Sequence, residues 1–525
     1  MKNNFLKNVY KYATTTENGA ISHAATGSAL LDYFSKCGTY RDRNLEEVFA
    51  DMNRIWAESP LLAMQIIFYN RMVSRKVKGL LASEKVQKGQ GNRSEFRKSI
   101  IWLARYQPEL LNANLWLIPV VGTWKDLWHE ELLGELDSKE VYTLIKRGIA
   151  DEYNKDLIAK YLPRIRSKSN TFNKRQEKLN RFAYGLLKYL KWTPVEYRTF
   201  KSAGKAHDFQ KQMCLNNWAA INFNSIPGKA LFRLVNKKGK DELTTLQRHE
   251  IEDTYTDWIL NQPTAKFTGY VYELMESVQP TMNLAQKVTI DKQFDGLIEL
   301  AKKDAGGIKE NIWCALDTSG SMTAQVANTS AYNICISLGI YFSSLNEGAF
   351  KDHVVMFDNT SRMLQLTGNF TDKVQQIRST KTAWGSTNFQ SVIEEIVRVR
   401  KTQPQIPVED FPTTLVVVSD MQFNPAGTNT QTNYEAAMRQ LRTVGLPNMR
   451  IVWWWVTGRG TDFPNQLDDE GVVLIGGFDG SILSLLIGGE EKEAGSIQKI
   501  KPMTPYDMML KALNQEVLQA IRVDE

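Results

Sequence analysis

The sequence predicts two architectures in one chain of 525 residues: a mainly helical first part, then an α/β part with a doubly wound, mostly parallel sheet. Up to about residue 300, apolar residues recur at helical spacing between prolines, and beyond it short apolar runs alternate with helical patterns. Oxygen-bearing residues follow two of those runs, at the strand ends where such sheets bind ligands. The composition, 42% hydrophobic and 23% charged, is that of a globular protein, and the length allows two to four domains.

Residues 1–300 are interpreted as an irregular helical-repeat domain of the HEAT-like kind. Apolar stripes at helical spacing cover residues 51–69, 141–149 and 249–260, and another stripe lies within 182–190. Prolines divide the region into helices of ordinary length, at Pro60, Pro108, Pro119, Pro163, Pro194, Pro227 and Pro263. Because no clean sequence period is present, we expect an irregular solenoid rather than a regular one.

Residues 301–500 are expected to form the α/β domain. Strands are predicted at 311–317, 353–357, 414–419, 450–456 and 472–475. Helices are predicted at 324–345, 370–379, 389–400, 434–444 and 481–487. Alternation of this kind is typical of a parallel sheet covered by helices on both faces. An amphipathic pattern over 503–521 predicts a closing helix, and residues 501–525 are expected to pack back on the helical domain.

Two carboxylates and three hydroxyls lie at predicted strand ends and in one loop: Asp317, Ser319, Ser321, Thr387 and Asp420. Because the carboxyl ends of parallel strands share one edge of a sheet, these side chains are expected to converge. A hard divalent cation, Mg²⁺ first, prefers such oxygen ligands. The alternative is a Ser/Gly turn that closes a strand, with Thr387 capping the helix that follows.

Positive charge is concentrated in one stretch. The whole chain has a net charge of +7, but residues 151–250 hold 21 Lys and Arg against 9 Asp and Glu. Such a stretch favours a polyanion such as RNA, and it also fits a solvated lysine-rich surface. The candidate RNA-binding residues in this stretch are Arg164, Arg166, Lys168, Lys174, Arg175, Lys178 and Arg181. A second basic cluster comprises Arg71, Arg75, Lys76, Lys78, Lys85, Lys88, Arg93, Arg97 and Lys98, of which Arg75, Lys76, Lys88 and Arg93 are taken as candidate RNA-binding residues.

The order Asp-x-Ser-x-Ser, then a loop Thr, then a strand-end Asp resembles the metal-ion-dependent adhesion site (MIDAS) of von Willebrand factor A (VWA) domains. A second resemblance is carried by the segments 88–93, 101–105, 114–115, 122–127, 197–198, 217–218, 226–227, 419–423 and 476–480. Through these segments, over roughly residues 70–520, the chain resembles the Ro autoantigen family, which binds RNA through its TROVE module, and its TROVE-like relatives.

The Ro resemblance implies a monomeric ring of helical repeats closed by a VWA domain, and a place in a ribonucleoprotein. Single-stranded RNA ends would pass through a basic hole, and structured small RNAs would bind the outer wall. Trp124 and Trp128 are expected to anchor helices, or else to stack on bases. The alternative function is a protein–protein adaptor or assembly component, in which the metal captures an acidic residue of a partner.

The motif search favours binding over catalysis. The sequence contains no His-Glu-x-x-His, no phosphate-binding Gly-x-x-x-x-Gly-Lys-Ser/Thr loop and no Gly-x-Ser-x-Gly elbow. Its four cysteines form no Cys-x-x-Cys pair. The first residues lack an apolar core of signal-peptide length, and no apolar run is long enough to cross a membrane. We therefore expect a cytoplasmic protein that is not an enzyme and has no membrane partner.

Overall fold

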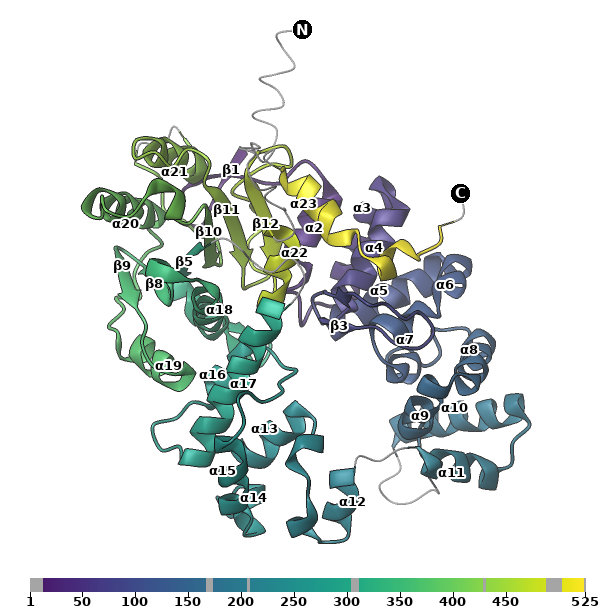
Figure 1. Cartoon of the computed structure of the whole chain (residues 1–525). Helices are drawn as coiled ribbons and strands as arrows, with labels where there is room; N and C mark the ends of the chain where they lie inside the picture. The colour runs from purple at the N-terminus through teal and green to yellow at the C-terminus, as the bar shows by residue number, and fades with distance from the viewer. Residues whose placement is uncertain are drawn as a thin grey trace. The chain divides into compact units, whose positions relative to one another are not determined.

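The structure, a computed structural model, describes residues 13–166, 173–204, 208–303, 311–427, 431–487 and 503–523 (Figure 1). Contacts along the chain divide it into two compact units. The helical unit comprises residues 41–214 and 513–525, and the sheet unit comprises residues 1–40 and 215–512. The boundary predicted at residue 300 is therefore not the boundary between the units, because the helices of residues 215–303 cluster with the sheet.

In the helical unit, capping residues in the sequence mark where helices begin. Asn44 and Glu47 form a capping box at the first helix, and Ser59 caps the second, which has Pro60 in its first turn. Its elements are α3 (Leu45–Glu58), α4 (Pro60–Arg71), β3 (Arg75–Lys76), β4 (Val86–Gln87), α5 (Arg93–Tyr106), α6 (Pro108–Asn114), α7 (Leu117–Val121), η1 (Trp124–Trp128), α8 (Ser138–Ala150), α9 (Glu152–Tyr161), α10 (Lys174–Leu190), α11 (Pro194–Ala203), α12 (Asp208–Cys214) and α24 (Glu516–Gln519).

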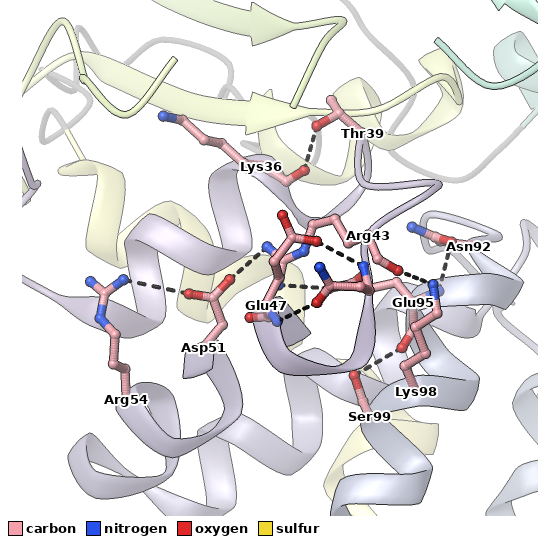
Figure 2. Close-up of polar contacts among 11 residues, drawn as sticks. Lys36, Thr39, Arg43, Glu47, Asp51, Arg54, Asn92, Glu95, Lys98 and Ser99 are labelled. Carbon is pink, nitrogen blue, oxygen red and sulfur yellow. Dashed lines mark hydrogen bonds and ion pairs between the residues drawn. The ribbon is translucent and has the colours of Figure 1, made fainter. Parts of the chain in front are cut away.

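Charged residues join α3 to α5 at the start of this unit. The Arg43 guanidinium lies 2.7 Å from the carboxylate of Asp51 and 3.5 Å from the carboxylate of the fully buried Glu95. The Lys98 ammonium donates a hydrogen bond to the Arg43 backbone carbonyl. Figure 2 shows these side chains pointing toward one another. A buried carboxylate needs such partners, because desolvation of an unpaired charge is costly. These cations therefore have a structural role.

The sheet unit contains one six-stranded sheet with the order β12-β11-β10-β5-β8-β9. The first five strands named are parallel, and β9 runs antiparallel beside β8. Strands β5 and β10 are buried at every residue, as expected for a parallel sheet covered on both faces. The strands are β5 (Ile312–Asp317), β8 (His353–Phe357), β9 (Ser361–Gln365), β10 (Thr414–Ser419), β11 (Arg450–Trp455) and β12 (Val472–Gly476).

Helices of the same unit cover this sheet. The apolar α18 packs against β5, β8 and β10, α20 packs against β8 and β9, and α2 packs against β12. The helices are α2 (Ala29–Cys37), α13 (Gly228–Asn236), α14 (Thr245–Arg248), α15 (Glu252–Leu260), α16 (Val271–Ser277), α17 (Leu284–Lys303), α18 (Ala331–Leu345), α19 (Phe370–Ser379), α20 (Phe389–Thr402), α21 (Asn433–Arg442), α22 (Leu483–Ile487) and α23 (Pro505–Leu513). A short antiparallel pair, β1 (Ala13–Thr15) and β2 (Ile21–His23), also belongs to this unit.

Of the helices described in either unit, none combines the length and the apolar character needed to cross a membrane.

Three sequence predictions differ from the structure. The helix predicted at 324–345 begins only at Ala331, because β6 (Gln325–Val326) and β7 (Thr329–Ser330) form a hairpin whose turn holds Ala327 at a φ of 56°. The edge strand β9 was not predicted, since its half-buried Ser-Arg-Met-Leu-Gln sequence lacks a long apolar run. The single helix predicted at 503–521 is two helices, α23 and α24.

The break between those two helices has a specific cause. The Gln515 side chain accepts a hydrogen bond from the Lys88 backbone nitrogen and donates one to the Lys88 carbonyl, at 2.8 and 2.9 Å. These bonds satisfy the backbone nitrogen and carbonyl of Lys88, as a neighbouring strand would. Within the helical unit, α24 also packs against α4. The helical unit thus includes α24, whereas residues 503–512, with most of α23, belong to the sheet unit, so the expected packing of all of residues 501–525 on the helical domain is corrected to its last part.

Replacing Gly296 with alanine should destabilise the sheet unit. Alanine is the better helix former by about 1 kcal/mol. However, a Cβ at this position of α17 would lie 2.3 Å from the Ala265 carbonyl oxygen. The segment that carries this carbonyl is held in place, because the Ala265 nitrogen donates to the Lys292 carbonyl at 2.8 Å. We expect a net loss of about 1–2 kcal/mol in the free energy of unfolding, measured by denaturant titration. Lys302→Ala, on the exposed face of the same helix, is the control and should change it by less than about 0.5 kcal/mol.

Asp291 predicts a pH dependence of stability. Its buried carboxylate accepts hydrogen bonds from the nitrogen and hydroxyl of Thr371, in the first turn of α19. Burial raises the pKa of Asp291 to about 6, although the hydrogen bonds from Thr371 act to lower it. The folded state therefore binds a proton more readily than the unfolded state, and this group makes the protein less stable as the pH rises from about 4 to about 6. Asp291→Asn should remove that slope and raise stability at pH 7 by about 1 kcal/mol. A difference between variant and wild type that stays constant from pH 4 to 7 would contradict this.

Candidate metal site and basic surface

The turn after β5 brings two hydroxyls together at the carboxyl end of the sheet. Thr318 anchors the turn, since its nitrogen and hydroxyl both donate to the Phe357 carbonyl at the end of β8. Asp317 Oδ1 accepts a hydrogen bond from the Ser319 nitrogen at 2.9 Å. The hydroxyls of Ser319 and Ser321 are 3.1 Å apart. The alternation seen in the sequence therefore gives convergent oxygens.

The loop that carries Thr387 lies against this turn. The Gly320 nitrogen donates to the Gly385 carbonyl at 3.1 Å. A Cβ at Gly385 would lie 2.3 Å from the Asn359 side chain, so any larger residue there would have to displace Asn359. Asn424, after β10, accepts from the Thr387 nitrogen and donates from its own nitrogen to the Thr387 carbonyl. Backbone contacts thus hold buried Thr387 beside the β5 and β10 ends.

Two buried carboxylates complete the cluster. Asp317 is fully buried and accepts from the Ser419 hydroxyl at 2.5 Å, and Asp420 accepts a hydrogen bond from Ser321. Burial and then the nearby charge of Asp420 raise the pKa of Asp317. Burial also raises the pKa of Asp420, against the hydrogen bond from Ser321. Among the described residues, no lysine or arginine forms an ion pair with either carboxylate. This electrostatic environment favours a bound cation.

The structure therefore brings four of the five predicted metal ligands together, and it holds Thr387 in the adjoining loop through its backbone. The hydrogen bonds join Asp317 to Ser319, Ser319 to Ser321, and Ser321 to Asp420. The donors are hard oxygens, which fit Mg²⁺ better than a softer metal. In the part of the chain that is described, no group of three or more His, Cys, Asp or Glu side chains is placed to hold a metal ion. Hydroxyls would accordingly have to supply part of the coordination.

Sequence reasoning missed several residues that shape this site. Asp358 and Asn359 follow β8, so the rule that found Asp317 and Asp420 would have found them too. Asp358 accepts from the Ala383 nitrogen, and Asn359 accepts from the nitrogen and hydroxyl of Ser386. Glu17 is a different case. Its nitrogen donates to the Gln422 side chain at 2.7 Å, and its charge contributes to the raised pKa of Asp420. No local pattern marks it.

The basic residues of the 151–250 stretch lie on exposed parts of the helical unit. Lys174, Arg175, Lys178 and Arg181 project from α10. Asn180 exchanges two hydrogen bonds with the Arg166 backbone, which fixes the segment of Arg164 and Arg166 against α10. Lys168 lies outside the described residues. Arg175 and Arg181 have carboxylate partners, Glu130 and Glu177, at 3.2 and 3.4 Å. Those exposed pairs are weak and leave the cations accessible.

The second predicted cluster is only partly a surface. Arg75 donates to the carbonyls of Val120 and Gly122, and Lys88 is 7% exposed. These two positions are corrected to structural roles, because their side chains are engaged or covered within the protein. Lys76 and Arg93 are exposed.

Both tryptophans that were considered for base stacking are core residues. Trp124 is 2% exposed, and its indole nitrogen donates to Asn154 at 2.8 Å. Trp128 is 4% exposed, and its ring centre lies 5.8 Å from that of Phe182. They therefore anchor helices, which was the favoured of the two interpretations.

Comparisons with known proteins agree with a chain in two parts. Residues 16–190 match the model of a family described as a domain of unknown function, DUF2828, and residues 312–513 match a second one, DUF7788. An uncharacterized protein of Acanthamoeba polyphaga mimivirus is 23% identical over 559 residues, which cover 97% of this chain and 88% of that protein. The similarity to this viral protein therefore spans both of the regions that match a family model.

A solved structure, the crystal structure of the Deinococcus radiodurans Ro (RSR) protein, is also similar. It is 13% identical, with a TM-score of 0.36, over 87% of this chain and 97% of that chain. A similarity at this level does not establish a shared arrangement, so the Ro likeness rests on the sequence motifs. The ring that these motifs imply stays a prediction.

Proposed function

We propose that this protein binds RNA through its helical unit and a divalent cation through its sheet unit. The RNA proposal is carried by the exposed cations on α10 and on the segment that Asn180 holds beside it. Positive side chains fixed side by side attract successive phosphates whatever the base sequence. The Ro resemblance of the sequence supports the same ligand. The function is one of binding, with no catalytic step.

Mg²⁺ is the cation proposed for the cluster of Asp317, Ser319, Ser321, Thr387 and Asp420. The ion would neutralise the two buried carboxylates and take hydroxyl oxygens and waters to complete its preferred octahedral shell. Its proposed role is to bind an acidic group of a protein partner while RNA occupies the helical unit. The two ligands would then be bound independently.

Binding of a fluorescent single-stranded RNA, measured across a range of salt concentrations, tests the RNA proposal. We expect log affinity to fall by about 0.7 for each phosphate neutralised as log salt rises by one unit. The same measurement without Mg²⁺ should give the same affinity. If no binding is measurable at low salt, the RNA function is rejected.

A protein–protein adaptor is the second candidate, and one observation favours it. Trp384 is 44% exposed, although it directly precedes Gly385 of the metal-site loop, and its ring centre lies 5.1 Å from that of Tyr332. It is held in the left-handed region, at a φ of 51°, which costs energy for a bulky residue. An exposed indole fixed in this way suits recognition of a partner.

Trp384→Ala tests that candidate. We expect proteins that bind only in Mg²⁺, and are released by a chelator, to be lost from pull-downs with the variant. The affinity for RNA should not change. An identical set of Mg²⁺-dependent proteins for variant and wild type would remove Trp384 from the partner site.

A further inference from the structure

Three elements of the helical unit bring basic side chains around Tyr161, the last residue of α9. The Lys125 ammonium, from η1, lies 4.9 Å from the centre of the Tyr161 ring, and the Lys160 ammonium lies 5.4 Å from it. Lys201, from α11, donates from Nζ to the Lys160 carbonyl at 3.2 Å. Arg164 follows three residues after Tyr161 and is exposed. Of the four cations, only Arg164 was selected from the sequence.

The packing around this cluster is tight, so the elements that carry the cations are held in place before any ligand arrives. A Cβ at Gly204, after α11, would lie 2.6 Å from the Lys160 nitrogen, which shows how closely α11 approaches α9. Trp124 joins η1 to α9 through its hydrogen bond to Asn154. The Tyr161 ring attracts both ammonium groups that lie against it. Such a preorganised arrangement lowers the cost of binding an anion.

The electrostatics of the cluster are unbalanced. Burial and the charge of Lys125 lower the pKa of Lys160, and burial and the charges of Arg164 and Lys125 lower that of Lys201. In the described part of the helical unit, none of the four cations forms an ion pair with a carboxylate, unlike Arg175 and Arg181 on α10. Repulsion among these positive charges costs free energy because no counter-ion is present, and a bound anion would offset that repulsion.

We propose that Lys125, Lys160, Arg164 and Lys201 form an anion site around Tyr161 that binds a phosphate of an RNA backbone. The proposal rests on the RNA-binding function proposed above and names a specific place for one contact. The non-bridging oxygens of a phosphodiester accept charge-assisted hydrogen bonds from ammonium and guanidinium groups. A free phosphate or pyrophosphate has the same chemistry, so the test must separate these sources from RNA.

Lysine labelling read by mass spectrometry provides this test. The intact protein is treated with acetic anhydride alone, with single-stranded RNA, or with inorganic pyrophosphate. We expect RNA to reduce the labelling of Lys125, Lys160 and Lys201, and pyrophosphate to do the same at higher concentration. Labelling of Lys302, an exposed residue of the sheet unit, should not change.

The outcomes distinguish this site from the wider RNA proposal. Protection of Lys174 and Lys178 by RNA, without protection of the three lysines around Tyr161, overturns the site and leaves RNA binding in place. Protection by pyrophosphate in a protein that does not bind RNA overturns the assignment to an RNA phosphate together with the RNA function. Protection of the three lysines by both ligands supports the proposal.

A pair of exposed substitutions gives a second measurement. Lys125→Gln with Arg164→Gln should make the salt dependence of RNA affinity shallower by up to about 0.7 log units per log unit of salt, because the site neutralises one phosphate. The matched control is Lys302→Gln with Lys401→Gln, which removes the same charge from the sheet unit. A slope equal to that of the control would overturn the site.

Discussion

Replacing Arg164, Arg166, Lys174 and Arg175 with glutamate should lower the affinity for single-stranded RNA by about a hundredfold or more at low salt. Four attractive contacts become repulsive ones. Each lost phosphate contact should also make the slope of log affinity against log salt shallower by about 0.7. The fold should survive, because all four side chains are exposed and their only carboxylate partner among the described residues is Glu130, on a surface pair.

The control for this variant reverses the same amount of charge elsewhere. Lys302, Arg362, Lys401 and Arg442 are exposed residues of the sheet unit, and replacing them with glutamate changes the net charge equally. We expect that control to keep most of its RNA affinity, since long-range attraction is screened within about 10 Å at 0.1 M salt. Filter binding at several salt concentrations measures both proteins. Equal affinities in the two variants would place RNA on another surface.

Asp317→Ala should abolish the stabilisation of the protein by Mg²⁺. A ligand that binds the folded state at a hundred times its Kd adds about 2.7 kcal/mol to the free energy of unfolding. Wild type should therefore melt at a higher temperature with Mg²⁺ than with a chelator, and the variant should melt at the same temperature in both. The substitution removes one of two buried carboxylates and the acceptor for Ser319 and Ser419.

The same variant separates the two proposed functions. Because the acidic cluster belongs to the sheet unit and the basic residues to the helical unit, Asp317→Ala should leave RNA affinity unchanged. Asp410→Ala, an exposed aspartate away from the cluster, is the control and should keep its response to Mg²⁺. Loss of RNA affinity in a folded Asp317→Ala protein would contradict the separation, and would place an RNA phosphate at the metal.

Much of the sheet unit was predictable because buried parallel strands are continuous apolar runs. The strands at 353–357 and 414–419 and the helix at 370–379 have the predicted bounds, since apolar runs and capping residues mark them locally. The same local logic placed Asp317 and Asp420 at strand ends. It failed where the pattern is weak, at the half-buried edge strand β9, and where a contact with Lys88 interrupts an amphipathic run between α23 and α24.

The sequence by itself determined the order of the elements, the oxygen donors at the strand ends and the concentration of positive charge. Only the tertiary structure decided which distant residues join them. Glu17 reaches Gln422, beside Asp420. Lys125 joins Lys160 at the Tyr161 ring, and Lys201 donates to the Lys160 carbonyl. It also showed that the Arg75 side chain donates a hydrogen bond to a backbone carbonyl within the protein and that Lys88 is buried. The physical reason is that periodicity records which face of an element is buried, whereas the partner of that face is chosen by packing between segments that are far apart in the chain.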